Sequence, residues 1–541
     1  MKFKLLFLFI FISAYSVSQN TLGILRNDSA SYNGYTLFAP YSSTETYLIN
    51  NCGEVVNQWT SSFTPAASVY LLENGNLLRT GKISNPVINF PGVGGKIELF
   101  DWDNNLLWEY SYSSNSHAQH HDIYPLPNGN VLMLAVDTMT EAEAIQAGRN
   151  PVYLIDDKLY NEQILELQPV GTNQANVVWE WNFRDHLVQD FDNTKDNYGV
   201  IGDHPELLDI NYLDGNSGGA NWLHINSIQY NAELDQIVLS SRLLSEIYII
   251  DHSTSTSEAA SHSGGTYGKG GDILYRWGNP EAYDKGNLDN RTLFGQHHPH
   301  WIPNGLVDGG KIMIFNNGNS IGHSSIDIIS PPQSSPGFYN YNSTTGYEPA
   351  TAEWSYTSSP DPSNFFSSIQ SSGQRLPNGN TLICDSDSGY IFEIDPSNTI
   401  VWEYINPDSA LGILSQGDDP SQNLMFRARR FPIDFVAFQG RDLTPGNPIE
   451  NNPDLSGCSI LSVADSSDTR FKLFPNPVAT TFSVSSQKPV SSIKVIDLFG
   501  NLVTASTDSK SIDISQISDG FYLVQIEIEG QLFVKKIIKK N

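Results

Sequence analysis

The amino-acid sequence predicts an all-β protein, a six-bladed β-propeller followed by a small C-terminal β-sandwich domain. The chain of 541 residues is rich in aromatic and turn-forming residues, with 25 Tyr, 26 Phe, 10 Trp, 42 Gly and 29 Pro. This composition suits short strands joined by tight turns. Two strand signatures alternate along most of the chain, and helical periodicity is scarce, with one short helix expected at residues 140–147.

The N-terminus has the three parts of a signal peptide, residues 1–18. Lys2 and Lys4 precede an unbroken apolar run at residues 5–12, and small residues follow at the expected cleavage site. The run is shorter than the ~20 residues that cross a bilayer. We therefore expect an exported chain that loses residues 1–18 and has no membrane span.

The next segment, residues 19–440, carries an internal repeat. An Asn-Gly turn between apolar strand residues recurs, once in a degenerate form. This pair favours hairpins because both residues tolerate positive φ. The turn asparagines are Asn74, Asn128, Asn231, Asn304 and Asn378. Strands that end in tryptophan, often followed by Glu and an aromatic residue, alternate with them at Trp59, Trp108, Trp179, Trp277, Trp354 and Trp402.

These two signatures predict the blades of a propeller. Each of the five intervals between the tryptophans holds one turn asparagine. A sixth blade would combine residues 34–56 from the front with residues 424–438 from the back, which closes the ring and removes exposed strand edges. The alternative is an array of β-sandwiches with coincidental turns. Residues 441–468, rich in Pro, Asn, Ser and Gly, read as a linker.

Histidine placement predicts a functional site. His121, His224 and His297 each stand seven residues before a turn asparagine. Equivalent blade positions face equivalent places around the central channel, so the three imidazoles are expected to converge at one end. Arg242 ends a strand of the same repeat as His224, and Asn226 shares the strand face of His224. A guanidinium offers a fixed fork of donors to a tetrahedral oxyanion, so the set predicts a sulfate or phosphate ester site.

The motifs around these histidines resemble those of the bacterial arylsulfate sulfotransferases. The matching stretches are HHDIYPLPNGN (residues 120–130), HINSIQYN (224–231) and GQHHPHWIPNG (295–305). The resemblance implies a six-bladed propeller that moves a sulfuryl group from a phenolic sulfate ester to a phenol. It also implies a transiently sulfated histidine and no nucleotide sulfate donor, so no cofactor is expected.

Carried over to this chain, the resemblance makes His297 the nucleophile. His121, His224 and Arg242 would hold the sulfate oxygens, with help from Asn226. The chain departs from the family pattern after the nucleophile, because His298 stands where related sequences often carry Asp, and His298 is expected to face away from the site. Arg427 and Arg430, in the closing blade, are expected to pair with surface acids, and the alternative is that they line the pocket.

The C-terminal segment, residues 469–541, resembles the type A sorting domain of the type IX secretion system. The shared features are PNP at Pro475–Pro477, DLFGNLV at residues 497–503, SDGFYLVQI at residues 518–526 and a basic tail. The resemblance implies that this segment engages the type IX secretion machinery. We therefore expect a secreted protein, extracellular or on the cell surface.

Charge and cysteine content limit the remaining interpretations. With 30 Lys and Arg against 59 Asp and Glu, the net charge of −29 argues against a nucleic-acid partner. The three cysteines, Cys52, Cys384 and Cys458, permit one disulfide with one thiol left over. Two other functions stay open: a metal-dependent site with His121, His224 and His297 as ligands, and a noncatalytic propeller that binds glycans or proteins at the cell surface.

Overall fold

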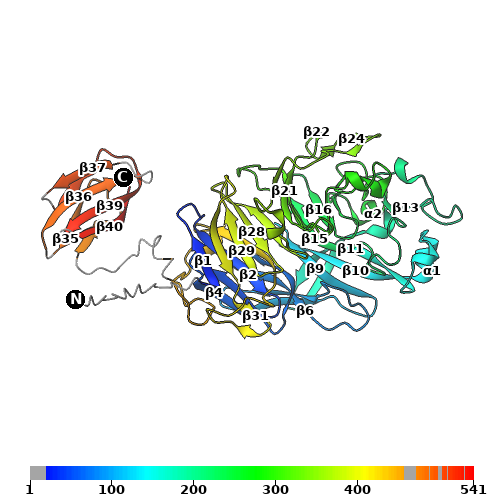
Figure 1. Cartoon of the computed structure of the whole chain (residues 1–541), viewed down its shortest axis with the longest axis horizontal. Helices are drawn as coiled ribbons and strands as arrows, with labels where there is room; N and C mark the ends of the chain where they lie inside the picture. The colour runs from blue at the N-terminus through cyan, green and yellow to red at the C-terminus, as the bar shows by residue number, and fades with distance from the viewer. Residues whose placement is uncertain are drawn as a thin grey trace, which may run out of the picture. The chain divides into compact units, whose positions relative to one another are not determined.

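The structure, a computed structural model, describes residues 20–455, 458, 471–486, 488–497, 502–507, 510–528 and 531–540. The predicted signal peptide and most of the second half of the predicted linker lie outside the described residues. The chain divides into two compact units, Met1–Gly457 and Cys458–Asn541. The first unit is called the body below. Its ribbon is almost entirely strands and loops (Figure 1).

In the described part of the body, the chain forms six antiparallel sheets of four or five strands. Five of them follow one another along the chain. Four turn asparagines lie between the first and second strands of their sheets, and Asn231 is the last residue of the first strand of its sheet. Their strands are β5 (Pro65–Leu71), β6 (Leu77–Lys82), β7 (Gly95–Phe100) and β8 (Leu106–Ser111); β9 (His117–Pro125), β10 (Val131–Thr140), β11 (Lys158–Val170) and β12 (Gln174–Asn182); β15 (Ile225–Asn231), β16 (Gln236–Ser241), β17 (Glu246–Asp251) and β18 (Tyr275–Trp277); β19 (His297–Trp301), β20 (Ile312–Asn316), β21 (Ser325–Ile329) and β26 (Trp354–Tyr356); and β27 (Ser372–Arg375), β28 (Thr381–Asp385), β29 (Tyr390–Ile394) and β30 (Ile400–Ile405).

The sixth sheet joins the two ends of the body. Strand β33 (Met425–Pro432) pairs with β2 (Gly34–Pro40), which continues into β3 (Glu45–Ile49) and β4 (Val55–Thr60). The front and back segments therefore pair as the sequence predicts. One further strand, β1 (Gly23–Asn27), pairs with β30 and was not predicted.

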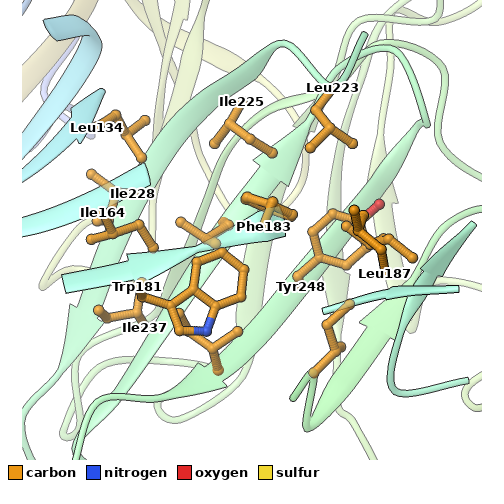
Figure 2. Packing of buried hydrophobic residues seen from close by; sticks show 14 of the residues in the cluster. Leu134, Ile164, Trp181, Phe183, Leu187, Leu223, Ile225, Ile228, Ile237 and Tyr248 are labelled. Carbon is orange, nitrogen blue, oxygen red and sulfur yellow. The ribbon is translucent and has the colours of Figure 1, made fainter. Parts of the chain in front are cut away.

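The first strands of the six sheets contact one another in a closed cycle, β5–β9–β15–β19–β27–β33 and back to β5. Neighbouring sheets bury apolar side chains between them. Figure 2 shows Leu134, Ile164 and Trp181 of one sheet beside Ile228 and Ile237 of the next, all fully or almost fully buried. The cycle brings the first strands, which carry the predicted site, around a common centre.

The repeated tryptophans connect each sheet to its neighbour. The indole N–H of Trp59 donates to the carbonyl of Asp101 at 2.8 Å, and that of Trp108 donates to Gln174 at 2.8 Å. Trp402 makes the equivalent bond to Asn51 at 2.8 Å. A buried indole needs a partner for its one donor, which explains why the motif recurs at the same place in successive sheets.

The long loops carry short elements. The helix α1 (Glu141–Gln146) forms where the sequence predicts it, with Thr140 and Glu143 in a capping box. The other short elements are η1 (Pro151–Tyr153), η2 (Phe183–Asp185), β13 (Leu187–Val188), η3 (Ile201–Asp203), β14 (Leu208–Asp209), α2 (Thr256–Ala259), η4 (Pro280–Tyr283), η5 (Leu288–Asn290), β22 (Gln333–Ser335), β23 (Phe338–Tyr339), β24 (Tyr341–Asn342), β25 (Gly346–Tyr347), η6 (Pro362–Asn364), β31 (Asp408–Ser409), β32 (Gly412–Ile413) and η7 (Val436–Phe438).

The first half of the predicted linker packs on the body. Pro448 forms a β-bridge with Glu54, and Asn451 forms one with Ser415. The side chain of Glu450 is buried. Cys52 and Cys458 are disulfide-bonded and Cys384 is a free, buried thiol. One disulfide and one spare thiol match the expectation from the sequence.

The second unit is a small β module. One sheet has the order β34–β35–β38 and another the order β37–β36–β39–β40, and both contribute to one hydrophobic cluster that includes Phe482, Ile493 and Val524. The strands are β34 (Phe471–Phe474), β35 (Thr481–Ser486), β36 (Val490–Ile496), β37 (Leu502–Thr507), β38 (Ser511–Asp513), β39 (Gly520–Ile528) and β40 (Gln531–Lys539). Across the described residues of both units, none of the helices has the length and apolar character to cross a membrane.

Candidate functional site

The three predicted histidines lie where the first strands are irregular. The pairing of β9, β15 and β19 with their second strands shifts register close to His121, His224 and His297. His121 and His224 have φ values of 46° and 49°, in the left-handed region that histidine enters more readily than most residues. A β-bulge of this kind redirects a side chain away from the regular alternation of a strand.

The structure brings these imidazoles together. The rings of His121 and His224 lie 4.8 Å apart, edge to face, and all three side chains are buried. Burial and the neighbouring imidazoles and Arg242 hold the pKa of His121 and of His224 well below 6.5. Burial likewise lowers the pKa of His297, to about 3, although a bond to Asn317 opposes that shift. The cluster is therefore neutral near physiological pH.

The orientation of His297 is set by Asn317. Asn317 Nδ2 donates to the carbonyls of Ser367 at 2.8 Å and Gln370 at 3.2 Å, which leaves its Oδ1 to face His297 Nδ1 at 2.8 Å. An amide oxygen only accepts, so Nδ1 carries the proton and Nε2 is unprotonated. Nε2 accepts one long hydrogen bond, from the backbone N–H of Gln370 at 3.3 Å. His297 is thereby held in the tautomer that a nucleophile requires.

His121 and His224 have their own supporting partners. His121 Nδ1 lies 3.0 Å from His120 Nδ1, and His120 Nε2 lies 2.8 Å from Glu162 Oε2. These two partners are buried as well. Asn221 Nδ2 donates to His224 Nδ1 at 2.7 Å, so the proton of His224 is on Nε2, where it can be donated onward.

Arg242 supplies a cation beside the imidazoles. It follows β16, and its backbone N–H donates to the carbonyl of His224 at 3.2 Å. In the described part of the chain its guanidinium has no acid and no hydrogen-bond acceptor, unlike the buried guanidinium of Arg276, which pairs with Glu246. Burial lowers the pKa of Arg242 from 12.5, yet an arginine stays charged. An unpaired cation next to neutral donors defines an anion site.

Asn226 is placed differently from the expectation. Its side chain is fully buried, and its Nδ2 donates to the carbonyl of Gln296 at 2.9 Å. One of the two N–H groups of this amide is therefore used within the protein. Gln296 precedes His297, so Asn226 acts on the site by holding the backbone of β19.

Two further expectations concern residues beside the cluster. His298 does face away from the site, since it lines a separate cavity with His300. The prediction that Arg427 and Arg430 pair with surface acids is wrong. Arg427 pairs with Asp122 at 2.7 Å and Arg430 pairs with Glu393, and both acids are fully buried. Strand β33 is the first strand of the closing sheet, so these side chains point into the protein.

The metal alternative gains no support at the predicted ligands. Among the described residues, the group of side chains that could hold a metal ion is His186, His262 and Asp272, whose ligand atoms lie within 4.8 Å of one another. Both ring nitrogens of His186 are already engaged, by Asp272 at 2.9 Å and the carbonyl of Ala259 at 2.8 Å.

Several supporting residues were not predicted as site residues. Asn317 and Gln370 hold His297, and His120 and Glu162 hold His121. The stretch FNNG at residues 315–318 contains Asn317. Glu162 lies on β11 of the same sheet as His121, and Gln370 lies in the loop before β27. Both are far along the sequence from the histidines that they support, and no local pattern marks them.

The fold and the cluster together define an all-β protein with three buried histidines near one arginine, and comparison with known families makes this specific. Residues 26–411 match the family described as Arylsulfotransferase (ASST), and this match spans well over half of the chain. The chain belongs to the arylsulfotransferase family. Residues 472–540 match the secretion system C-terminal sorting domain. Both resemblances drawn from the sequence are confirmed, and they suggest a sulfotransferase that is exported to the cell surface or beyond.

Comparisons with individual proteins add less. None of the curated proteins matches the chain. A protein of unknown function from Bacteroides caccae is 11% identical with a TM-score of 0.39, and the match covers 74% of this chain and 99% of that one. A putative 6-phosphogluconolactonase from Bacteroides fragilis is 12% identical with a TM-score of 0.34, covering 74% and 99%. The periplasmic gluconolactonase of Pseudomonas aeruginosa is 10% identical with a TM-score of 0.33, covering 69% and 96%.

Proposed function

We propose that this protein is a secreted arylsulfate sulfotransferase that moves a sulfuryl group from a phenolic sulfate ester to a phenol through a sulfohistidine. The supporting observation is the unpaired guanidinium of Arg242 beside three neutral imidazoles, one of which, His297, has an unprotonated Nε2. The six sheets of the body would be the blades of a propeller with this site at one end of its channel.

In the first half-reaction, His297 Nε2 attacks the sulfur in line with the ester oxygen. The N–S bond forms as the S–O bond to the phenol breaks, and the leaving phenolate oxygen accepts a hydrogen bond from a neutral imidazole N–H, that of His121 or His224, and takes its proton from water. Arg242 and the imidazole N–H groups stabilise charge on the remaining sulfate oxygens. In the second half-reaction the acceptor phenol gives its proton to water and attacks sulfur; the new O–S bond forms as the N–S bond breaks, so His297 is regenerated. Asn226 and Asn317 position the strand and ring of His297.

The test is release of a chromogenic phenol from an aryl sulfate, with and without an added phenol acceptor. We expect acceptor-dependent release and, with radiolabelled sulfate, label on the protein that an acceptor removes. His297→Asn should abolish both signals, whereas the control His262→Asn, at an exposed histidine, should keep them. Release that is independent of acceptor would indicate a hydrolase, and binding without release would indicate a noncatalytic protein.

For the chain as a whole, we propose a signal peptide at residues 1–18, the propeller at 19–440, a linker at 441–468 and a sorting domain at 469–541. The two sheets of the C-terminal unit would form a β-sandwich that the type IX machinery recognises. Deletion of residues 469–541 should then keep the protein inside the cell envelope, while the full chain appears outside. Equal amounts outside for both chains would refute the proposed role of this segment.

A further inference from the structure

The body contains a large cavity that does not include the histidine cluster. Its volume is about 800 Å³, the size of site that takes a drug-sized ligand. It is lined by residues of the Asn-Gly turns and of the strand ends next to them, whereas His121, His224, His297 and Arg242 are absent from its walls. The cavity is therefore at the turn end of the first strands, away from the candidate catalytic site.

A buried ion pair stands between the two sites. Arg427 lines the cavity and pairs at 2.7 Å with Asp122, the residue after His121. Asp122 is fully buried and also accepts from the backbone N–H of Ile228 at 3.1 Å. Arg427 therefore reaches from the wall of the cavity to the residue that follows His121. Since its charge is neutralised by Asp122, it is not the group that would attract a ligand to the cavity.

Three polar groups in the cavity make no hydrogen bond or ion pair in the described residues. The guanidinium of Arg429 has no acid; this side chain is exposed at the edge of the cavity and lies over the ring of Phe431, 5.6 Å from its centroid. The hydroxyl of Tyr124 has no hydrogen bond, and Nδ1 of His298 is buried without a partner. Tyr124, His298 and His300 line the same cavity as Arg429. Burial lowers the pKa of His300 to about 4. The other arginines of the described lining, Arg375, Arg427 and Arg430, each pair with an acid, so Arg429 is the cation that a ligand can reach without competing with a carboxylate.

The rest of the lining is apolar and aromatic. The ring of Tyr70 meets that of Tyr124 edge to face at 5.9 Å, and Trp301 and several leucines complete the wall. Among the residues described as lining the cavity, the one carboxylate is that of Glu73, which is exposed on a turn. His298 has a φ of 52°, a conformation that costs free energy for a residue with a side chain and that is held in this wall.

We propose that this cavity is a second binding site, for a small aromatic anion whose rings contact the apolar wall and whose carboxylate or sulfonate meets Arg429. An unpaired guanidinium with neighbouring neutral donors suits one anionic group, and aromatic side chains suit a planar apolar body. The site is independent of sulfuryl transfer, because it uses none of the residues assigned to that reaction.

The probe is 8-anilinonaphthalene-1-sulfonate, which is aromatic, carries one negative charge and becomes fluorescent in apolar surroundings. The full chain should bind it saturably. Arg429→Gln should weaken binding about tenfold or more, the effect of losing a hydrogen bond to a charged group. Leu72→Trp, which fills the cavity from its rim, should also weaken it. The control Lys269→Gln, at an exposed cation outside the lining, should bind as the parent does.

Arg242→Gln separates this site from the catalytic one. Binding that persists in Arg242→Gln supports a second site, and binding that this change abolishes would place the dye at the histidine cluster and overturn the proposal. Equal binding by the parent, Arg429→Gln and Leu72→Trp would overturn it as well. Circular dichroism and thermal midpoints establish that each variant is folded. None of these results depends on whether the protein transfers sulfate.

Discussion

Replacing Asn317 with aspartate should shift the acidic side of the pH–rate profile to higher pH. In the native protein Asn317 accepts the Nδ1 proton of His297 at 2.8 Å, and the pKa of His297 is lowered to about 3. The nucleophile is therefore neutral down to strongly acidic pH. A carboxylate in place of the amide favours the imidazolium and raises a neighbouring pKa by about 1–3 units.

The size of the effect follows from that shift. If the pKa of His297 rises to about 6, roughly one-tenth of the protein has a neutral nucleophile at pH 5. The parent stays almost fully neutral at this pH. The ratio of kcat/KM between Asn317→Asp and the parent should therefore fall about tenfold from pH 8 to pH 5. At pH 8 a smaller, constant loss is expected, because aspartate cannot donate to the carbonyls of Ser367 and Gln370.

The assay is the rate of phenol release from an aryl sulfate under single-turnover conditions, measured from pH 4 to pH 9. Asn317→Leu is the matched control, since it removes the partner of Nδ1 without adding charge, and it should lose activity equally at all pH values. Folding at each pH is checked by circular dichroism. Superimposable profiles for Asn317→Asp and the parent, after scaling, would refute the assignment of His297 Nε2 as the nucleophilic atom.

Other predictions concern charge and stability. Arg242→Lys keeps the charge but loses the planar fork, so kcat/KM for an aryl sulfate should fall about tenfold or more. A fully active variant would rule out the proposal that Arg242 holds the sulfate oxygens. Burial disfavours the charged form of His252, but its contacts with Asp235 at 2.7 Å and Glu166 at 3.0 Å outweigh burial and raise its pKa to about 9. The raised pKa increases the free energy of unfolding by at most about 3 kcal/mol, an increase that is present below pH 6.5 and is lost as pH rises through 9. Urea unfolding of His252→Gln should therefore give a lower free energy of unfolding than the parent at pH 6 and little difference at pH 10.5. An equal decrease at both pH values would contradict this. Glu246→Gln leaves the buried Arg276 uncompensated and should lower the free energy of unfolding by about 3–5 kcal/mol, whereas an unchanged thermal midpoint would show the pair to be dispensable.

The repeated turns and tryptophans predict most of the strands and sheets of the body. A hairpin turn and a buried indole are local requirements, so their alternation predicts where strands begin and end. Pairing of the front segment with β33 was predictable because a ring with a missing edge would expose strand groups to solvent. Strand β1 escaped prediction, since it only extends an existing sheet at its outer edge.

The histidines of the candidate site could be predicted from the sequence, but the residues that hold them in place could not. The spacing from the turns singled out His121, His224 and His297 because the first strands reach a common centre. It could not show that bulges redirect these side chains, or that the donor of Asn226 is used on Gln296. The partners of Arg427 and Arg430 come from Asp122 and Glu393, on other sheets, and only the closed cycle of strands brings them into contact.

The electrostatics of the cluster favour a sulfate ester over a phosphate ester. Three neutral imidazoles and one guanidinium give the site a single formal positive charge. An aryl sulfate carries one negative charge, whereas a phosphate monoester carries about −1.5 to −2 at pH 7, and a surplus charge in a buried site is costly. An aryl phosphate should therefore bind better at pH 5, where it is a monoanion, than at pH 8. An aryl sulfate should show no such trend, and equal pH dependence of the two inhibition or Michaelis constants would contradict this charge balance.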